Sequence, residues 1–234
     1  MRLVLKLGGS LLYNKDNQII ITRIKEYAKV IAQLAIDGHD IAIVVGGGKP
    51  ARAFISAARE LGASEAQCDW LGIKTSRLNA ELLCASLQRH AYPKIVESLD
   101  ELEIAAYSNH IVLMGGLTPG QSTNAVAALA AEITHADLLL NATNVDGVYD
   151  KDPNDPGAIK LDDVSIENLE IILSGGGTRA GEYRLFDPVA IRVVKRSKIG
   201  TVIFNGLNPS NISKIVAGEK IGTMISHKTS SMEE

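Results

Sequence analysis

The sequence has no long hydrophobic run and only a small net charge. No segment approaches the roughly 18 uninterrupted apolar residues of a membrane-spanning helix, and the first residues enter a strand-like pattern at once instead of a signal peptide. The net charge is −3, which argues against a general nucleic-acid-binding surface. We therefore expect neither a membrane nor a nucleic acid among its partners.

Cysteine is scarce as well. Cys68 and Cys84 lack the spacing of metal ligands, and two thiols in 234 residues fit a reducing compartment such as the cytoplasm. The five histidines are scattered without an HExxH-like pattern, and there is no G-x-S-x-G motif. Neither a protein-held metal nor hydrolase chemistry is expected.

The remaining composition is that of a globular protein. With 46% hydrophobic and 22% charged residues, the chain can bury a large core as one α/β domain or two small ones. Stretches with strand character alternate with stretches of helical periodicity. The expected strands are 3–7, 41–45, 111–114, 137–142 and 201–204, with a shorter one centred on Ile95. The expected helices are 24–35, which stops at Gly38, then 49–61, about 65–90, 125–136, and 188–197 with Asp187 as its N-cap.

This alternation predicts the fold class. We expect a mostly parallel sheet, buried between helices on both faces, with the functional loops at the carboxyl ends of its strands. No internal repeat and no linker rich in Gly, Ser or Pro divides the chain. Residues 144–157 are expected to form a loop because they are rich in Gly, Pro and Asp, and the last nine residues are expected to fray.

Three glycine-rich turns, each directly after an apolar run, are the most informative feature. They follow residues 3–7, 41–45 and 111–114 and read GGS, GGGKPAR and GGLTPGQSTN. Glycine lets backbone N–H groups crowd around an anion that a Cβ would keep out, and a following helix adds its positive N-terminal end. Three such turns indicate several phosphates held at once.

The second turn has competing interpretations. Residues 46–51 satisfy G-x-G-x-x-A after a strand, and Glu65 or Asp69 lies near the position of the ribose acid in a dinucleotide-binding oxidoreductase. A Walker A loop is excluded because proline follows Lys49 where Ser or Thr should hold magnesium. The structural alternative is a turn that only eases strand-to-helix packing.

Lys6 lies just before the first turn. The pleat of strand 3–7 places Lys6 and Val4 on one face and the three leucines on the other. A solvated edge lysine is one interpretation. The first strand of a doubly wound sheet tends to be buried, however, and a buried ammonium needs an anion, which a transferring phosphoryl group would supply.

Two later loops carry polar side chains after a strand. The loop 117–123 places hydroxyl and amide groups before a helix, where they form an anion cradle or, in the case of Ser122 or Thr123, an ordinary N-cap. In 143–153, turn residues, three aspartates and Tyr149 follow a strand. They are either turn-formers and solvated acids, or Tyr149 stacks on a base.

Taken in order, the motifs resemble the amino acid kinase superfamily, and within it the archaeal type of uridylate kinase. They read KLGGS, VVGGGKPAR, CDWLGIKTSRLNA, MGGLTPGQSTNAVAALAAE, ATNVDGVYDKDP and FDPVAIRVVKRSKI. The resemblance implies a single domain over 1–225 with a tail of 226–234, and an open αβα sandwich with UMP over the N-terminal half and ATP over the C-terminal half. It also implies phosphoryl transfer from ATP to UMP, magnesium carried with ATP, and a homohexamer built as a trimer of dimers. Val30 and Ile36, apolar but off the core face of the first helix, fit a second buried surface.

The resemblance implies site residues as well. Lys6 would offset charge on the transferring group. ATP would contact Gly9, Ser10, Gly48, Arg52, Thr143, Asn144, Tyr149 and Asp152. UMP would contact Gly47, Asp69, Thr118, Pro119, Gly120, Gln121, Ser122, Thr123 and Asn124.

The sequence departs from many relatives at Asn124, where they carry an Asp that orients the active-site lysines. Either Asn124 does this by hydrogen bonding, or another acid such as Asp146 replaces it. Two alternatives share the fold. Isopentenyl phosphate kinases have a histidine beside the glycine turn, where this chain has residues 49–51, and a non-catalytic nucleotide sensor is disfavoured because Lys6 is present.

Overall fold

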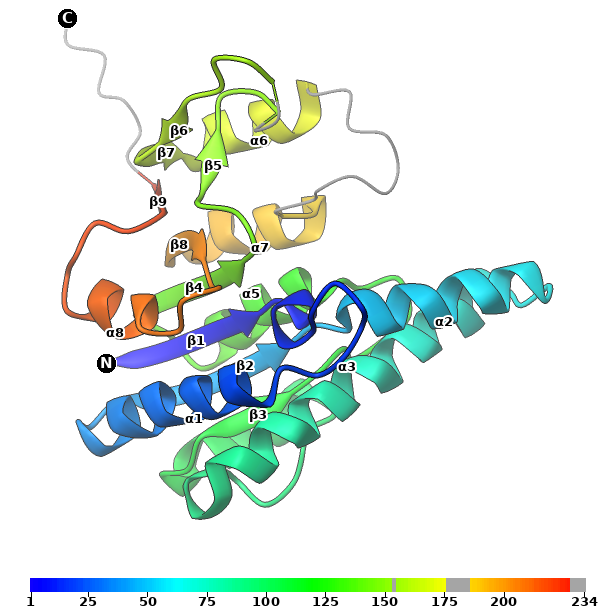
Figure 1. The fold of residues 1–234 in the computed structure, drawn as a ribbon. Coiled ribbons are helices and arrows are strands. Elements are labelled where there is room, and N and C mark those ends of the chain that lie inside the picture. The colour runs from blue at the N-terminus through cyan, green and yellow to red at the C-terminus, as the bar shows by residue number, and fades with distance from the viewer. Residues whose placement is uncertain (153–154, 176–185, 228–234) are drawn as a thin grey trace, which may run out of the picture.

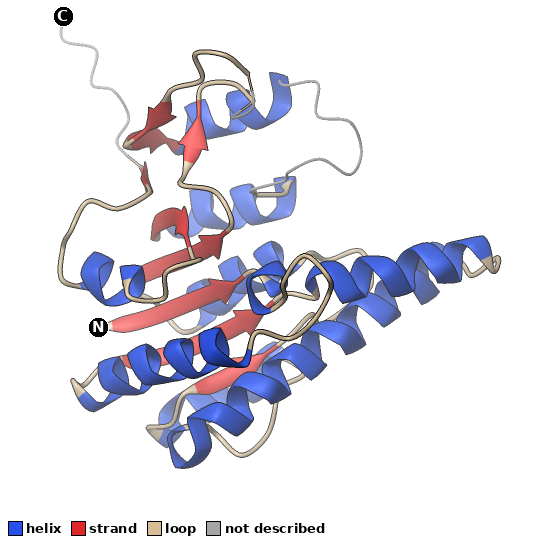
Figure 2. Ribbon diagram, in the orientation of Figure 1, coloured by secondary structure: helices blue, strands red, loops and turns tan. Residues whose placement is uncertain are grey.

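A seven-stranded sheet forms the centre of the protein (Figures 1 and 2). The structure, a computed structural model, describes residues 1–152, 155–175 and 186–227. The strands lie in the order β3 (Val112–Met114), β2 (Asp40–Val45), β1 (Arg2–Leu7), β4 (Leu138–Thr143), β8 (Gly200–Asn205), β9 (Thr223–Ser226) and β7 (Asp163–Ser165). All neighbours in this sheet are parallel except β8 and β9. A separate antiparallel pair is formed by β5 (Val148–Tyr149) and β6 (Lys160–Leu161).

Helices cover both faces of the sheet, which confirms the predicted αβα sandwich. One face packs against α1 (Ile21–Ile36), α3 (Glu65–Leu87) and α8 (Asn211–Val216). The other packs against α4 (Leu99–Ala105), α5 (Thr123–Ile133), α6 (Ile166–Gly175) and α7 (Pro188–Ser197). Helix α2 (Gly48–Glu60) packs on α3, and the two project together beyond the sheet (Figure 1). Short 3₁₀ helices cover Gly9–Leu12, Gln88–His90 and Ala106–Ser108. Within the described ranges, no helix has both the length and the apolar character needed to span a membrane.

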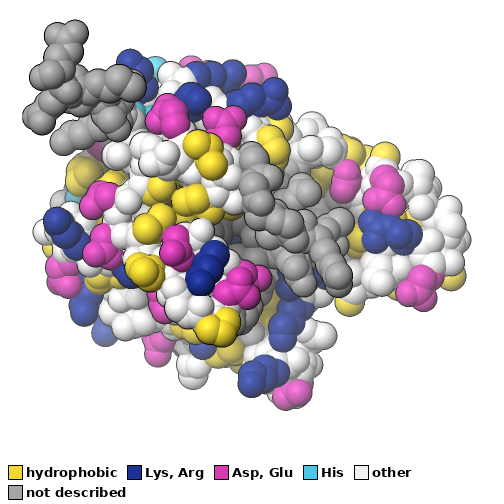
Figure 3. Space-filling model, turned by 90° about the horizontal axis from the view of Figure 1, so that it is seen from above, with side chains coloured by type: hydrophobic (Ala, Val, Ile, Leu, Met, Phe, Trp, Pro, Cys, Tyr) yellow, Lys and Arg dark blue, Asp and Glu magenta, His cyan; other side chains and the backbone are white. Residues whose placement is uncertain are grey.

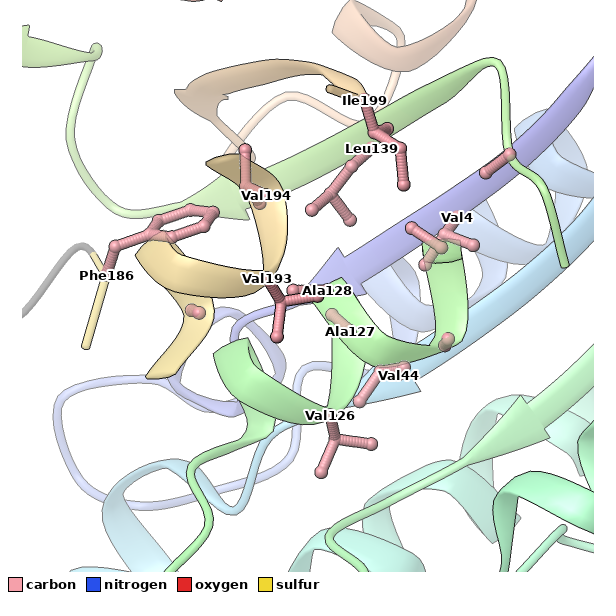
Figure 4. Close-up of a cluster of buried hydrophobic side chains, with 14 of the residues drawn as sticks. Val4, Val44, Val126, Ala127, Ala128, Leu139, Phe186, Val193, Val194 and Ile199 are labelled. Carbon is pink, nitrogen blue, oxygen red and sulfur yellow. The ribbon is translucent and has the colours of Figure 1, made fainter. Parts of the chain in front are cut away.

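Strand β1 divides the core in two, as the pleat predicts. Its three leucines belong to the cluster formed with α1 and α3, whereas Val4 belongs to the cluster on the other face, which includes Val126 and Ala127 of α5 (Figure 4). All of these side chains are buried, and each contributes about 1.5–3 kcal/mol of hydrophobic stabilisation. Because β1 has paired neighbours on both sides and helices on both faces, the turn that follows it starts from a firmly held position.

The region after α3 corrects two predictions. The helix expected over about 65–90 ends at Leu87, because Gln88 has a φ of +52° and the next residues form a 3₁₀ turn. The strand expected around Ile95 is wrong. Only an isolated bridge, between Val96 and Met114, joins this segment to the sheet.

Two helices begin at the polar side chains that cap them. Asp187 caps α7, as predicted, by accepting hydrogen bonds from the N–H groups of Val189 and Ala190 at 2.9 and 3.2 Å. Ser122 caps α5, so this helix begins two residues earlier than expected, and it ends at Ile133 instead of continuing to residue 136.

The predicted loop and tail are only partly within the described residues. The loop 144–157 contains the short strand β5, which pairs with β6, and its residues 153–154 lie outside the described part. Ser226 still belongs to β9, so the predicted tail begins later than residue 226, and 228–234 are not described. The single domain over 1–225 stays a prediction.

Acidic and basic side chains are interspersed on the face of the molecule seen in Figure 3. This distribution agrees with the small net charge of −3. An attraction for anions must therefore come from a local arrangement of groups.

Candidate functional site

The first two glycine turns meet at the carboxyl ends of β1 and β2. A Cβ on Gly9 would lie 2.5 Å from the nitrogen of Gly48, and a Cβ on Gly48 would lie 2.7 Å from the nitrogen of Ser10. Gly48 also has a φ of +67°, a left-handed conformation that side chains disfavour. Both positions therefore require glycine, because the two backbones touch.

Four backbone N–H groups of these turns are available to a ligand. No hydrogen bond among the described residues uses the N–H groups of Gly9, Ser10, Gly47 or Gly48. Gly47 is the N-cap of α2, so two of these groups lie at the positive end of a helix. Neighbouring N–H groups that have no partner within the protein are of the kind that binds phosphate.

The third turn lies next to the second. The Oγ1 of Thr123 lies 3.4 Å from the position that a Cβ on Gly46 would take. Helix α3 holds the start of the turn, because Ser76 Oγ accepts a hydrogen bond from the N–H of Gly116 at 2.7 Å and Arg77 Nε donates to the carbonyl of Gly116 at 3.1 Å. The three turns that the sequence singles out therefore converge.

Asp69 holds the tip of the third turn. Its Oδ2 accepts a hydrogen bond from the N–H of Gly120 at 2.8 Å. Thr118 and Gly120 are exposed and Pro119 is half-buried, while Thr118 Oγ1 donates to Gln121 Oε1 at 3.2 Å. Asp69 and the loop predicted for UMP are thus brought together across 51 positions of sequence.

Ser122 links this loop to α7. Its Oγ accepts hydrogen bonds from the N–H groups of Asn124 and Ala125, each at 3.1 Å, and donates to Oδ2 of Asp187. The N-cap interpretation is confirmed for Ser122, whereas Thr123 is the first residue of the helix. The same Asp187 carboxylate caps α7 with its other oxygen, a link that the sequence pattern does not reveal.

Lys6 lies on the face of β1 that α5 covers, beside Val44 of β2 and Asn141 of β4 in the strand register. Its side chain is half-buried, and burial lowers the pKa of the ammonium from 10.5 to about 8. None of the ion pairs among the described residues includes it. An edge-strand lysine is excluded, because β1 is central, and an arriving anion would stabilise the charge.

Asn124 and Asp146 differ in what they can offer such a lysine. Asn124 is the second residue of α5, the helix over the Lys6 face, and its Oδ1 is buried without a hydrogen-bond partner among the described residues. Asp146 is exposed and accepts a hydrogen bond from Asn205 Nδ2 at 2.8 Å. Of the two, Asn124 holds the uncommitted acceptor.

The residues predicted for adenosine lie in β4, in β5 and in the loops that follow these strands. They are Thr143, Asn144, Tyr149 and Asp152. Thr143 Oγ1 donates to Asn144 Oδ1 at 3.5 Å. The first glycine turn adjoins them, because the N–H of Gly8 donates to the carbonyl of Ala142 at 3.0 Å. The carboxyl end of β4, with Thr143 and Asn144, therefore lies next to the first glycine turn.

Two cations of α2 have different surroundings. Lys49 Nζ donates to the backbone carbonyls of Asn14 and Lys15 at 3.2 and 3.3 Å, and so holds the loop after the first 3₁₀ helix. Arg52 is exposed and forms no hydrogen bond or ion pair with the rest of the described chain. Its guanidinium is therefore available to an anionic ligand.

Two hollows of the described surface lie away from the three glycine-rich turns. One of about 560 Å³ lies at the amino ends of β1, β2 and β3, and one of about 710 Å³ lies between α1 and α3. Neither is lined by a glycine turn. Within the ranges that the structure covers, no three His, Cys, Asp or Glu side chains gather as a metal-binding group.

Comparison with known proteins identifies the family. A family model described as the amino acid kinase family matches residues 1–205. The chain belongs to the amino acid kinase family. The match runs through β8 and includes the three glycine turns, Lys6 and the residues predicted for adenosine.

Uridylate kinases of other organisms match nearly the whole of this chain. The uridylate kinase of Methanobrevibacter smithii is 43% identical over 97% of this chain and 100% of that protein. The uridylate kinase of Methanocella arvoryzae is 46% identical over 96% of this chain and 99% of that protein. The crystal structure of uridylate kinase from Archaeoglobus fulgidus, 44% identical, matches with a TM-score of 0.86 over 97% of this chain and 100% of that one. The UMP kinase of Bacillus anthracis, 21% identical with a TM-score of 0.82, shows that the fold is shared.

Three residues of this amino acid kinase are not singled out by the sequence, although they hold the glycine turns. Ser76 lies on α3 about two turns after Asp69 and near the same side of the helix, whereas Arg77 and Asn79 lie to either side of that line. All of them belong to the motif CDWLGIKTSRLNA, and their polarity at this helical spacing is the signal that could have found them.

Proposed function

We infer that this protein is a UMP kinase, which transfers the γ-phosphoryl group of ATP to UMP and gives ADP and UDP. The observation that carries this inference is full-length similarity to uridylate kinases, at 43% identity, in a chain whose glycine turns converge. In the reaction a phosphate oxygen of UMP forms a bond to the γ-phosphorus, and the bond between that phosphorus and the oxygen of the ADP leaving group breaks. The protein's task is to align two anions and to disperse their charge.

On the ATP side, we propose that Lys6 offsets the charge of the transferring group. The N–H groups of Gly9, Ser10 and Gly48 would contact the phosphates, together with Arg52. The adenosine would lie against Thr143, Asn144, Tyr149 and Asp152. The unpaired guanidinium of Arg52 and the uncommitted N–H groups support this assignment.

On the acceptor side, we propose that Gly47 and the loop from Thr118 to Asn124 surround UMP. Asp69 would position the ribose. Its hydrogen bond with the N–H of Gly120 places its carboxylate next to this loop. Backbone groups of the loop would read uracil, whose N3–H donor and O4 acceptor are reversed in cytosine. A mismatched base would leave buried groups unpaired at about 1–3 kcal/mol each.

We propose that Mg²⁺ arrives with ATP. When bound, it would neutralise phosphate charge. The chain's own contribution would come from N–H donors and the cations Lys6 and Arg52, which bind anions directly.

The test is ADP release with ATP, magnesium and one acceptor at a time, using UMP, CMP, dUMP, AMP and isopentenyl phosphate. We expect kcat/KM for UMP to exceed the values for CMP, AMP and isopentenyl phosphate by at least about tenfold. A preference of that size for CMP, AMP or isopentenyl phosphate would overturn the proposed acceptor. No turnover with any acceptor, in a protein that still binds ATP, would favour a nucleotide sensor.

We also propose a cytoplasmic homo-oligomer, a hexamer built as a trimer of dimers. Exposed apolar side chains on the helices support self-association: Ile36 is 64% exposed, Phe54 57% and Trp70 42%, whereas Val30 packs against the core. Light scattering at micromolar concentration should report a mass several times 25 kDa. A 25 kDa monomer would contradict the proposal.

A further inference from the structure

Asn79 of α3 has no exposed surface and three hydrogen bonds at the glycine turns. Its Nδ2 donates to the carbonyl oxygens of Gly46 at 2.8 Å and Gly47 at 3.2 Å. Its Oδ1 accepts from the hydroxyl of Tyr13 at 2.6 Å. A buried amide with donors and acceptor both engaged has only one orientation that satisfies all its partners.

These bonds determine where two N–H groups point. In a trans peptide the C=O and N–H of one unit point in opposite directions, and the structure has no cis peptide among the described residues. Holding the Gly46 carbonyl towards Asn79 therefore directs the N–H of Gly47 away from α3. The Gly47 carbonyl is held in the same way and also accepts a hydrogen bond from the N–H of Ala51 at 3.5 Å. The N–H of Gly48 therefore points away from α3 as well.

Consecutive glycines cannot hold such a direction by themselves. Glycine has no side chain to pack and loses more backbone freedom on folding than any other residue. The φ of +67° at Gly48 is one that the rest of the structure must maintain. Asn79 supplies that constraint from the core, on the side of the turn opposite to the two N–H groups.

Tyr13 extends the constraint to the first turn. It directly follows the 3₁₀ helix Gly9–Leu12, and its N–H donates to the carbonyl of Ser10 at 3.4 Å. Burial raises the pKa of the Tyr13 phenol, so the hydroxyl keeps the proton that it donates to Asn79. One amide thus joins the end of the first turn to the second turn.

We propose that Asn79 is a positioning residue for phosphoryl transfer, which aims the N–H groups of Gly47 and Gly48 at the phosphates, and that Tyr13 fixes the orientation of its amide. The proposal rests on the phosphate sites of the proposed function. In this proposal Asn79 touches no substrate itself. It sets the direction of the N–H groups that stabilise the phosphate charge.

Asn79→Asp is the sharpest test, because the side chain keeps its shape but presents an acceptor to two carbonyl oxygens. Tyr13→Phe removes only the hydroxyl. Thr75→Val is the matched control: Thr75 is buried on the same helix, and its hydroxyl donates at 2.7 Å to Leu71 of that helix and touches no turn. For each variant kcat, KM for ATP and UMP, and the midpoint of thermal unfolding are measured.

We expect kcat to fall at least about a hundredfold in Asn79→Asp, the loss typical of a misplaced oxyanion donor. Tyr13→Phe should lower kcat several-fold with little change in KM, while Thr75→Val should lose stability and keep kcat within about twofold. The proposal is overturned if Tyr13→Phe keeps wild-type kcat, or if Asn79→Asp folds and also keeps it. Should Asn79→Asp fail to fold, Tyr13→Phe decides alone. A wild-type protein without UMP kinase activity would instead refute the proposed function.

Discussion

Replacement of Lys6 by methionine should stabilise the substrate-free protein and remove most of its activity. Methionine has a similar length and no charge, so it fits the half-buried site on β1. The wild-type ammonium is held there without an ion pair among the described residues, and its proposed partner is the transferring phosphoryl group. Stability and catalysis are therefore opposed at this position.

The magnitude follows from the pKa. Burial lowers the pKa of Lys6 from 10.5 to about 8. At about 1.4 kcal/mol per pKa unit, keeping the charged form in the folded state costs at most about 3.5 kcal/mol, and less because the side chain is partly solvated. Because the folded pKa lies below the unfolded one, the cost is complete below pH 8. It disappears as the pH rises towards 10.5, where the unfolded state also loses its proton.

Thermal unfolding of the substrate-free wild type and Lys6→Met at pH 7 and pH 10 measures this cost in stability directly. At pH 7 Lys6→Met should unfold at a higher temperature than the wild type, with roughly 2–4 °C for each kcal/mol gained, and the difference should shrink at pH 10. Its kcat should fall at least about a hundredfold, with a smaller change in UMP affinity. Lys6→Arg, which keeps the charge, is the control. A Lys6→Met protein with near-wild-type kcat and no gain in stability at pH 7 would refute the reasoning.

Three further predictions concern the glycine turns and their neighbours. Asp69→Asn should weaken UMP and CMP alike and leave their ratio nearly unchanged in competition assays, since the proposed role of Asp69 is to position the ribose and Asn keeps an oxygen that can accept the hydrogen bond from the Gly120 N–H; a large shift in the ratio would show that Asp69 reads the base. Arg52→Ala should raise KM for ATP about tenfold with little effect on UMP, and an unchanged KM for ATP would remove Arg52 from the site. Gly48→Ala should lower the free energy of unfolding by more than about 2 kcal/mol, because its Cβ would lie 2.5 Å from the carbonyl carbon of Gly9 and its φ is +67°; denaturation as stable as the wild type would show that the two turns can separate.

Local patterns predict much of the fold. The alternation in β1 correctly assigns its leucines to one cluster and Val4 to the other, because a pleat has a strict period of two. The Asp187–Pro188 pair correctly predicts the start of α7, because a cap is a local hydrogen bond. The positions of the three glycine turns follow from the same kind of local signal.

Properties set by contacts distant in sequence are not predictable in this way. The segment around Ile95 has a strand-like composition, but only one of its residues forms a bridge to β3. Nor does any local pattern show that β9 lies antiparallel to β8, an arrangement decided by packing at the edge of the sheet.

Some residues of the candidate site can be predicted from local sequence, and others cannot. Lys6 and the glycines are recognisable because their chemistry is unusual for their local setting. Asn79 reads as one polar residue on a long helix, and its partner Tyr13 is 66 positions away. Its role emerges only when the chain is folded and the carbonyls of the second turn lie against its amide.

Transfer of labelled phosphate is the most direct test of the central claim. The protein is mixed with magnesium, UMP and ATP labelled in its γ-phosphate, and the products are separated. The label should appear in UDP, at a rate that depends on UMP concentration and falls at least about a hundredfold in Lys6→Met. Label found only in inorganic phosphate, or no transfer to UMP by a protein that binds both nucleotides, would contradict the account.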